Sequence, residues 1–238
     1  MQRPMSSTSA TREPSGDVTV ITIIWLFALT WCEWSGLDRL TTGFLADQQG
    51  FVWRHDWLLT AVLHDGVRQL SAVAVFALIA YVLMPTRWSC GLSLPDRLRM
   101  LTGVLLSLLA VNVIKRLSLT SCPWDLAAFG GMAQYVSHWA WGIGDGGPGH
   151  CFPSGHASAG FAFFAVSMPW LMSSLPARRW RGRWLFVLIL AAGLVAGLAQ
   201  VLRGAHYPSH VLWTGFICWV CACVVFRPLP AFRLARAS

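Results

Sequence analysis

Residues 184–202 read WLFVLILAAGLVAGLAQVL, a stretch of the chain without a single charged side chain. About 20 apolar residues in a helix are long enough to cross the hydrocarbon core of a bilayer, which is roughly 30 Å thick. The sequence contains further apolar runs of comparable length, at about 18–34, 68–84, 99–114, 156–174 and 208–226. The pattern therefore predicts an all-α, polytopic membrane protein with six transmembrane helices.

The composition agrees with this prediction. Hydrophobic residues make up 55% of the 238-residue chain and charged residues only 12%, whereas a soluble domain has about 25% charged residues. The first apolar run ends in WCEWSG, which lacks the small residues of a cleavage site, so we expect an uncleaved anchor. We predict a cytoplasmic tail at 1–17, a membrane domain at 18–226 with outer loops at about 35–67 and 116–155, and a basic cytoplasmic tail at 227–238.

The distribution of charge between the two sides predicts the orientation. With the N-terminus inside, the inner side holds 12 of the 18 basic and 3 of the 10 acidic residues, which makes it +9 against −1 outside. Because basic loops stay in the cytoplasm, we expect both termini on the cytoplasmic side of a bacterial-type inner membrane.

No basic stripe interleaved with aromatic residues occurs outside the membrane, so nucleic acid is not an expected partner. The pattern does not indicate an oligomeric state.

The histidines all fall on the outer, periplasmic side in this arrangement. Loops exist on both sides of the membrane, so a one-sided distribution favours chemistry at the outer face. The seven residues are His55, His64, His138, His150, His156, His206 and His210.

The outer end of the quoted run continues RGAHYPSH. Gln200 and Arg203 are three residues apart and share a helix face, and Gly204 allows a turn toward His206. Pro208 suits the first turn of the last helix. An arginine beside histidines at a helix end is well suited to hold phosphate. The alternative is an interfacial arginine with two interfacial imidazoles.

Two other outward-facing stretches carry candidate residues. Lys115 follows Asn112 at the end of the third run, where a lysine marks a functional site or simply extends to the headgroups. PSGH at 153–156 starts the fourth run, and a helix start with Ser154 and Gly155 leaves backbone N–H groups for an anion. An ordinary serine cap is the alternative there.

A fourth stretch, within 35–67, alternates apolar and polar residues at helical spacing. We expect its apolar side chains to lie in the membrane interface. We interpret the polar side chains Asp56, His64 and Asp65 as its solvated face rather than as catalytic residues.

Together these motifs resemble the type 2 phosphatidic acid phosphatase superfamily of membrane lipid phosphatases. The resemblance rests on Lys115 with Pro123 eight residues later, PSGH at 153–156 and GAHYPS at 204–209, in that order. It implies that His206 is the nucleophile that forms a phosphohistidine and that His156 is the general acid. It also implies that the phosphoryl oxygens are held by Lys115, Ser154 and Gly155, without a metal or cofactor.

The chain departs from the family pattern at three positions. Cys122 stands where the first motif usually has arginine, and Gln200 and His210 replace an arginine and an aspartate of the third motif. Arg203 lies one turn from Gln200 and can stand in for a missing guanidinium. The usual aspartate fixes the tautomer of the nucleophile. A neutral imidazole at His210, the third expected catalytic residue, can accept the same bond but lacks the charge, which Asp125 or Asp145 can supply from another loop.

The cysteines flanking two of the motifs suggest a covalent link. Cys122 and Cys151 lie in the same outer loop, next to Pro123 and to Phe152–Pro153. An oxidising compartment permits a bridge between them. We therefore predict a Cys122–Cys151 disulfide.

We expect an integral membrane enzyme that hydrolyses a phosphomonoester or diphosphate headgroup at the outer leaflet. The candidate lipids are a polyprenyl diphosphate, phosphatidylglycerophosphate, phosphatidate and lipid A. A phosphotransferase using the same site remains an alternative, as does a catalytically inactive relative. A metal-binding membrane protein is a further alternative, because His206 and His210 have the i, i+4 spacing of zinc-binding helices.

Overall fold

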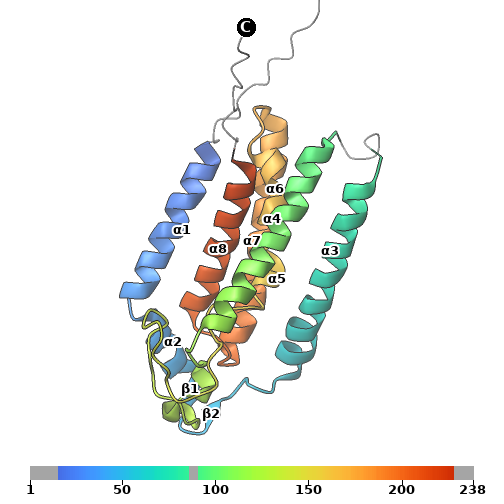
Figure 1. The fold of residues 1–238 in the computed structure, drawn as a ribbon. Coiled ribbons are helices and arrows are strands. Elements are labelled where there is room, and N and C mark those ends of the chain that lie inside the picture. Colours follow the sequence, from blue (N-terminus) through green and yellow to red (C-terminus); the bar gives the residue numbers. More distant parts are fainter. Residues whose placement is uncertain (1–15, 86–90, 228–238) are drawn as a thin grey trace, which may run out of the picture.

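The computed structural model describes residues 16–85 and 91–227, and it is a helical bundle with α2, β1 and β2 gathered at one end (Figure 1). The long helices are α1 (Gly16–Trp34), α3 (Val67–Leu83), α4 (Leu94–Leu117), α7 (Pro176–Leu202) and α8 (Pro208–Phe226). The shorter helices are α2 (Leu37–Leu45), α5 (Ser158–Phe161) and α6 (Phe164–Leu171). A π-helix, η1 (Leu58–Gly66), precedes α3, and the outer loop contains the 3-10 turns η3 (Pro123–Asp125) and η4 (Ala127–Phe129). Two short antiparallel strands, β1 (Ala46–Asp47) and β2 (Gly50–Phe51), complete the described elements.

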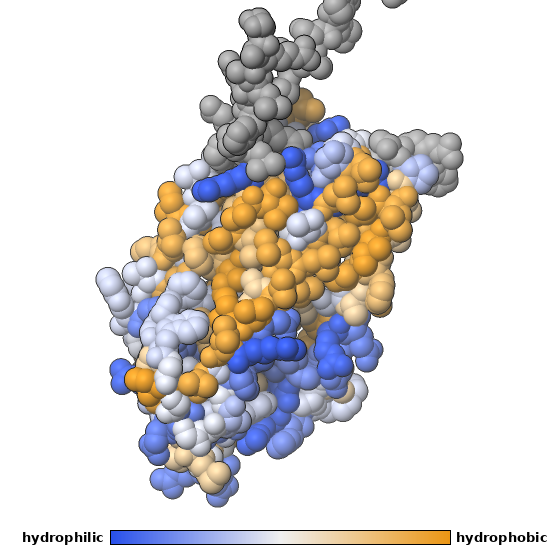
Figure 2. Space-filling model, in the orientation of Figure 1, coloured by the Kyte–Doolittle hydropathy of each residue, from blue (hydrophilic) through white to orange (hydrophobic). Residues whose placement is uncertain are grey.

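The bundle has the composition of a membrane domain. Among the described residues, five helices are long and apolar enough to cross a bilayer: α1, η1 with α3, α4, α7 and α8. Figure 2 shows hydrophobic side chains in a broad band between two more hydrophilic ends. The predicted all-α membrane class is therefore confirmed, together with five of the predicted spans.

The fourth predicted span, 156–174, is interrupted. It forms α5 and α6, which together reach only from Ser158 to Leu171. The backbone tightens between them, because the N–H of Phe163 bonds to Gly160 and that of Val166 bonds to Phe163, in each case three residues back. Such three-residue bonding shortens and distorts an α-helix. The sequence predicted one continuous helix because apolar composition does not report this change in hydrogen bonding.

The second span begins about ten residues earlier than predicted. Leu58–Gly66 forms a π-helix that continues directly into α3, so the helix runs from Leu58 to Leu83. The predicted outer loop 35–67 is therefore shorter, and its second half is not a separate interfacial segment. Polar residues at helical spacing fit both an interfacial helix and the outer end of a membrane helix. The spacing therefore did not reveal that the helix starts at Leu58.

Small residues allow the helices to approach closely. A Cβ atom added at Gly160 of α5 would lie 2.4 Å from the backbone nitrogen of Gly193 in α7. At Gly197 of α7 it would lie 2.3 Å from Val211 in α8. Helix association in membranes relies on such close backbone approach. These contacts hold α5, α7 and α8 together at the end of the bundle where the outer loops gather (Figure 1).

We predict that Gly160→Ala lowers the thermal stability of the detergent-purified protein, because the added methyl group meets backbone that cannot rotate away. Overpacking of this kind costs about 1–3 kcal/mol. Gly43→Ala in α2 is the matched control, since nothing lies within 4 Å of its added Cβ. The measurement is the melting temperature followed by intrinsic tryptophan fluorescence. Equal melting temperatures for the two variants would contradict the packing described here.

Candidate active site

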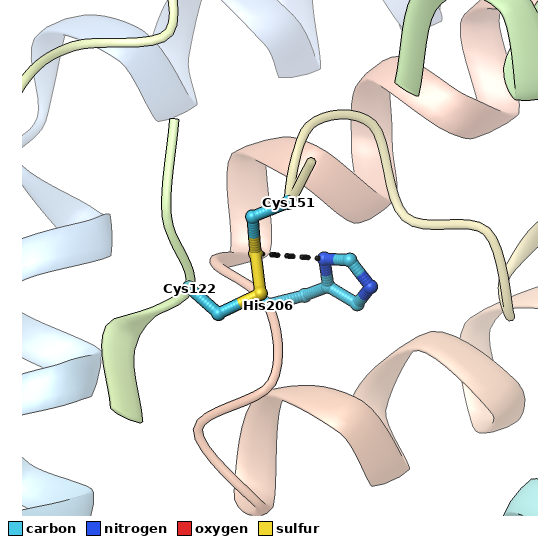
Figure 3. A group of neighbouring side chains, drawn as sticks. All are labelled: Cys122, Cys151 and His206. Atoms are coloured by element: carbon cyan, nitrogen blue, oxygen red, sulfur yellow. Dashed lines mark hydrogen bonds between the residues drawn. A yellow bond between two sulfur atoms is a disulfide. The ribbon is translucent and has the colours of Figure 1, made fainter. Parts of the chain in front are cut away.

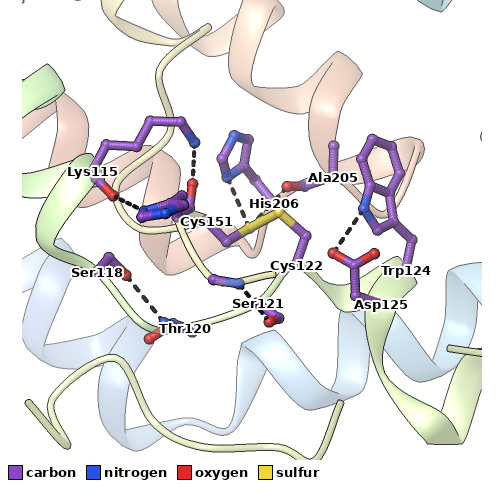
Figure 4. Close-up of a disulfide and its surroundings, with 12 residues drawn as sticks. Lys115, Ser118, Thr120, Ser121, Cys122, Trp124, Asp125, Cys151, Ala205 and His206 are labelled. Carbon is purple, nitrogen blue, oxygen red and sulfur yellow. Dashed lines mark hydrogen bonds between the residues drawn. A yellow bond between two sulfur atoms is a disulfide. The ribbon is translucent and has the colours of Figure 1, made fainter. Parts of the chain in front are cut away.

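Lys115 projects from the last turn of α4 toward the loop that precedes PSGH (Figure 4). Its Nζ donates a hydrogen bond to the carbonyl oxygen of His150 at 2.5 Å. A Cβ added at Gly155 would lie 3.6 Å from the Cδ atom of Lys115. The lysine side chain therefore runs along PSGH, whereas Asn112 bonds to the backbone of its own helix at Leu108.

PSGH is anchored on α8. The N–H of Ser154 donates to the carbonyl of His210 at 3.3 Å, and the hydroxyl of Thr214 donates to the carbonyl of Ser154 at 3.0 Å. The hydroxyl of Ser154 is buried and forms no hydrogen bond with any described residue. The N–H groups of Gly155 and His156 likewise have no acceptor within the described part of the chain. The turn thus offers several donors that an anion can satisfy.

The third motif turns sharply between α7 and α8. Gly204 has φ +74°, a conformation that favours glycine, and an added Cβ would lie 2.4 Å from the ring of Phe51 in β2. The same turn is held from the first motif, because the N–H of Trp124 bonds to the carbonyl of Gly204 at 3.0 Å. His206 follows two residues later and is only 4% exposed.

A disulfide joins Cys122 to Cys151 and lies against His206 (Figure 3). The Sγ atom of Cys151 is 3.5 Å from Nδ1 of His206 and 3.1 Å from the carbonyl oxygen of Ala205. A disulfide sulfur carries no proton and can only accept, so this contact favours the tautomer with the proton on Nδ1. The lone pair of the imidazole is then on Nε2.

The electrostatics around His206 keep its ring neutral. Burial lowers the pKa of His206 well below its usual value, and the neighbouring Lys115 and His156 lower it further. A neutral imidazole is the form that can act as a nucleophile. Lys115 therefore lies close enough to influence both the imidazole of His206 and the PSGH turn.

His156 experiences the same positive surroundings. Burial lowers the pKa of His156 to about 4, with further contributions from His64, Lys115, Arg203 and Arg68, in that order. The ring centroids of His156 and His64 are 3.9 Å apart. The prediction that His64 belongs to a solvated face is therefore wrong. In the sequence, only the one-sided placement of the histidines pointed to a position near the site.

Arg203 lies at the end of α7 with its guanidinium held by three groups. Nη1 donates to the side-chain oxygen of Gln200 at 3.1 Å, and Nε donates to the backbone carbonyl of Arg54 at 3.2 Å. The guanidinium carbon is 5.7 Å from the ring centroid of Trp124. The predicted pairing of Arg203 with Gln200 is therefore present, and the arginine is directed toward the same group of residues as His156.

His210 is fully buried in an aromatic cage rather than beside a carboxylate. Its ring makes edge contacts with His138, Phe152 and Tyr207, and neither ring nitrogen has a hydrogen-bond partner among the described residues. His206 also contacts it, with ring centroids 5.9 Å apart.

The aspartates suggested as substitutes do not reach either histidine. Asp125 accepts a hydrogen bond from the indole of Trp124 (Figure 4), and Asp145 accepts from Ser121 and Gly147. In the described part of the chain neither forms a hydrogen bond with His206 or His210. Both carboxylates instead stabilise the outer loop.

Sequence reasoning missed a carboxylate on the far side of the aromatic cage. Glu33 at the end of α1 accepts hydrogen bonds from Trp213 at 2.8 Å, Trp139 at 3.1 Å and His138 at 3.2 Å. Its partners come from two segments far from Glu33 in the sequence, the outer loop with His138 and Trp139 and helix α8 with Trp213. No short motif in the sequence therefore indicated this network.

His206 and His210, the pair considered for metal binding, do not form the group of side chains that lie close enough together to share an ion. Within the described residues, Cys122, Cys151 and His206 are the side chains close enough to hold an ion. Metals bind the thiolate form of cysteine, and both sulfurs are joined in the disulfide. The donor set in this state therefore does not fit a metal site.

The arrangement of these motifs matches a known family. A model of the PAP2 superfamily matches residues 97–233, more than half of the chain. The chain belongs to the PAP2 superfamily. The predicted family is thereby confirmed.

Comparison with solved structures gives a fold of the same kind. This PAP2 chain is similar to the first transmembrane PAP2-type phosphatidylglycerolphosphate phosphatase from Bacillus subtilis, with a TM-score of 0.52 and 17% sequence identity. The match covers 88% of this chain and 92% of the other. At this identity the likeness shows the shared fold. Among curated proteins, none matches this chain.

We predict that Cys122 and Cys151 of this PAP2 protein resist alkylation until a reductant is added, whereas Cys32, Cys218 and Cys221 react as free thiols after unfolding alone. Peptide mass spectrometry of unfolded protein, with and without reductant, measures the difference. Removing the bridge by a double substitution to serine should lower stability by roughly 2–4 kcal/mol, because it frees the loop between the two cysteines. Alkylation of either bridge cysteine without reductant would contradict the pairing.

Proposed function

We propose that this protein is a lipid phosphate phosphatase of the bacterial-type inner membrane. Its site is proposed to face the periplasm, with both termini in the cytoplasm and α5 with α6 completing a sixth crossing. The observation that carries the proposal is the position of His206: Nδ1 lies against the disulfide, while Lys115 and His156 lie close enough to lower the pKa of its imidazole. A neutral imidazole beside cations suits attack on a phosphoryl group.

The proposed reaction has two steps. In the first, Nε2 of His206 forms a bond to phosphorus, the bond from phosphorus to the leaving oxygen breaks, and that oxygen takes a proton from His156. In the second, water attacks the phosphohistidine and gives a proton to the imidazole of His156. The bond between phosphorus and Nε2 of His206 breaks, its electron pair returns to Nε2, and inorganic phosphate leaves. Acid and base catalysis by one residue contributes about 10²–10⁴-fold in known enzymes.

Four groups are proposed to hold the phosphoryl oxygens. Lys115 and Arg203 supply positive charge, and Ser154 supplies a hydroxyl that has no other partner among the described residues. The N–H of Gly155 adds a backbone donor. A transferring phosphoryl group spreads its charge over three oxygens, so positioned donors and cations supply most of the stabilisation.

Three further residues are proposed to support the site. His210 packs against His206 and limits the rotation of its ring. Gln200 orients Arg203 through their hydrogen bond. Asp125 is proposed to act indirectly, by fixing Trp124 beneath the guanidinium of Arg203.

The proposed substrates are membrane lipids with a terminal phosphate. The solved relative is named a phosphatidylglycerolphosphate phosphatase, and the candidate headgroups for this chain also include phosphatidate, a polyprenyl diphosphate and lipid A. No metal or cofactor is needed for the two steps described, since every proton and charge is handled by named side chains.

We predict that the detergent-purified protein releases phosphate from at least one of these four lipids with EDTA present. His206→Ala should reduce the rate by about a thousandfold or more, as removal of a covalent nucleophile does elsewhere. His55→Ala is the matched control, because His55 is an exposed histidine of the outer segment. Release that depends on added metal would contradict the histidine mechanism. Transfer of phosphate to an added acceptor lipid without net release would favour the phosphotransferase.

We also predict that kcat/KM for a phosphomonoester lipid increases as the pH falls from 7.5 to 5.5. The lowered pKa of His156, about 4, leaves this residue unprotonated in the free enzyme at neutral pH. Acid restores the missing proton, either directly or through the phosphate monoanion, whose second pKa is about 6. The lowered pKa of His206 keeps the nucleophile unprotonated over the same range.

We expect an increase of roughly threefold to tenfold per pH unit, because kcat/KM reports the ionisation of free enzyme and free substrate. His156→Gln should lower activity throughout and remove the contribution of this residue to the slope. A rate that instead rises with pH would contradict the assignment of His156 as the acid.

A further inference from the structure

His64 lies outside the three phosphatase motifs and yet stacks on one of their central residues. Its ring centroid is 3.9 Å from that of His156, with the ring planes 33° apart. Nδ1 of His64 is bound to the carboxylate of Asp65 at 2.9 Å. Nε2 forms no hydrogen bond with any residue that the structure describes. With Asp65 accepting from Nδ1, an anion bound at Nε2 would be held by the imidazolium form of the ring, which donates from both nitrogens.

The segment that carries His64 has unusual backbone geometry. Leu58–Gly66 is a π-helix of 9 residues, and π-helical turns occur frequently at functional sites. Arg68 follows four residues after His64, about one turn along the same continuous helix, so the two side chains share a helix face. The π-helix and the first turn of α3 therefore place an imidazole and a guanidinium on the same side of this helix, and Arg68 lowers the pKa of His156.

The basic side chains that act on His156 outnumber the two that are assigned to a single phosphoryl group. Lys115 and Arg203 already provide two cations for the group attacked by His206. Arg68 adds further positive potential at His156, and the carboxylate of Asp65 is bound to His64. Clustered cations with few acids are expected where more than one anionic group binds.

We propose that His64, together with Arg68, binds a second phosphoryl group of the substrate, and that the preferred headgroup is therefore a lipid diphosphate. The inference rests on the proposed phosphatase function. In that reaction the leaving group departs on the side of His156, which is the side that His64 covers. A leaving group that is itself a phosphate places its charge beside His64 and Arg68.

The chemistry of a diphosphate fits this geometry. Nε2 of His206 attacks the terminal phosphorus, and the bond between that phosphorus and the bridging oxygen breaks. The electron pair stays on the bridging oxygen, which leaves as part of a lipid monophosphate and takes its proton from His156. The second phosphoryl group is bonded to the same bridging oxygen, so it lies next to the acid. In a phosphatidylglycerophosphate the second phosphate is separated by a glycerol unit and lies farther away.

The test compares a polyprenyl diphosphate with the polyprenyl monophosphate of the same chain length, and with phosphatidylglycerophosphate as a third substrate. His64→Leu should lower kcat/KM for the diphosphate by roughly 10- to 100-fold, which corresponds to the loss of one hydrogen bond to a charged group. The rate with the monophosphate should change less than about threefold. Arg68→Gln should act in the same direction, and Arg68→Lys should retain most of the activity.

Two controls separate binding from folding. His64→Gln keeps an N–H donor and should recover part of the preference for the diphosphate. His55→Ala and Arg39→Gln remove an exposed histidine and an exposed arginine elsewhere on the outer side, and they should leave the ratio of the two rates unchanged.

The outcomes distinguish the inference from the function on which it rests. If the wild-type protein hydrolyses these lipids and His64→Leu lowers all rates equally, the second subsite is wrong and the phosphatase stands. A selective loss with phosphatidylglycerophosphate would overturn the assignment to a diphosphate. Failure of the wild-type protein to release phosphate from any of the three substrates would overturn both.

Discussion

The contact between His206 and the Cys122–Cys151 disulfide joins the three segments on which the site is built. Cys122 precedes Pro123 of the first motif, Cys151 leads into the second, and His206 belongs to the third. A covalent bond between two of these segments restricts the positions that the third can occupy. The buried imidazole is then held by its surroundings and not by a network of hydrogen bonds. A backbone hydrogen bond from Trp124 to the carbonyl of Gly204 also joins the first motif to the third.

The disulfide also changes how positive charge is supplied. The family pattern has arginine where this chain has Cys122, so a cation is replaced by a covalent link. In the proposed site Arg203 supplies the missing charge from the end of α7, and its orientation is determined by Gln200, by the carbonyl of Arg54 and by the ring of Trp124. Arginine bound on several sides loses less conformational entropy when it binds an anion. We therefore expect one well-held guanidinium to take over the role of more loosely held ones in the proposed site.

The sequence was sufficient to predict the membrane class, the motif segments and five spans, because apolar length and helix-end residues are local signals. It was insufficient for features that depend on tertiary contact. The break between α5 and α6 occurs where Gly160 meets the backbone of Gly193, a partner that the apolar run itself does not reveal. The π-helix before α3 mixes apolar and polar residues as an interfacial helix in a loop does, so composition did not reveal that it continues the membrane helix. The position of His64 on His156 depends on both helices packing at one end of the bundle.

The replacement of the usual aspartate by His210 is consistent with its surroundings. The ring is fully buried among His138, Phe152 and Tyr207, where a carboxylate would lose its hydration and depend on His206 as its partner. A neutral imidazole packs in such a cage as an aromatic ring. In the proposed mechanism the disulfide fixes the tautomer of His206, because its sulfur can accept the Nδ1 proton of His206 but cannot donate one. The tautomer with a free Nε2 is thereby favoured without a negative charge, in a pocket too apolar to hold one.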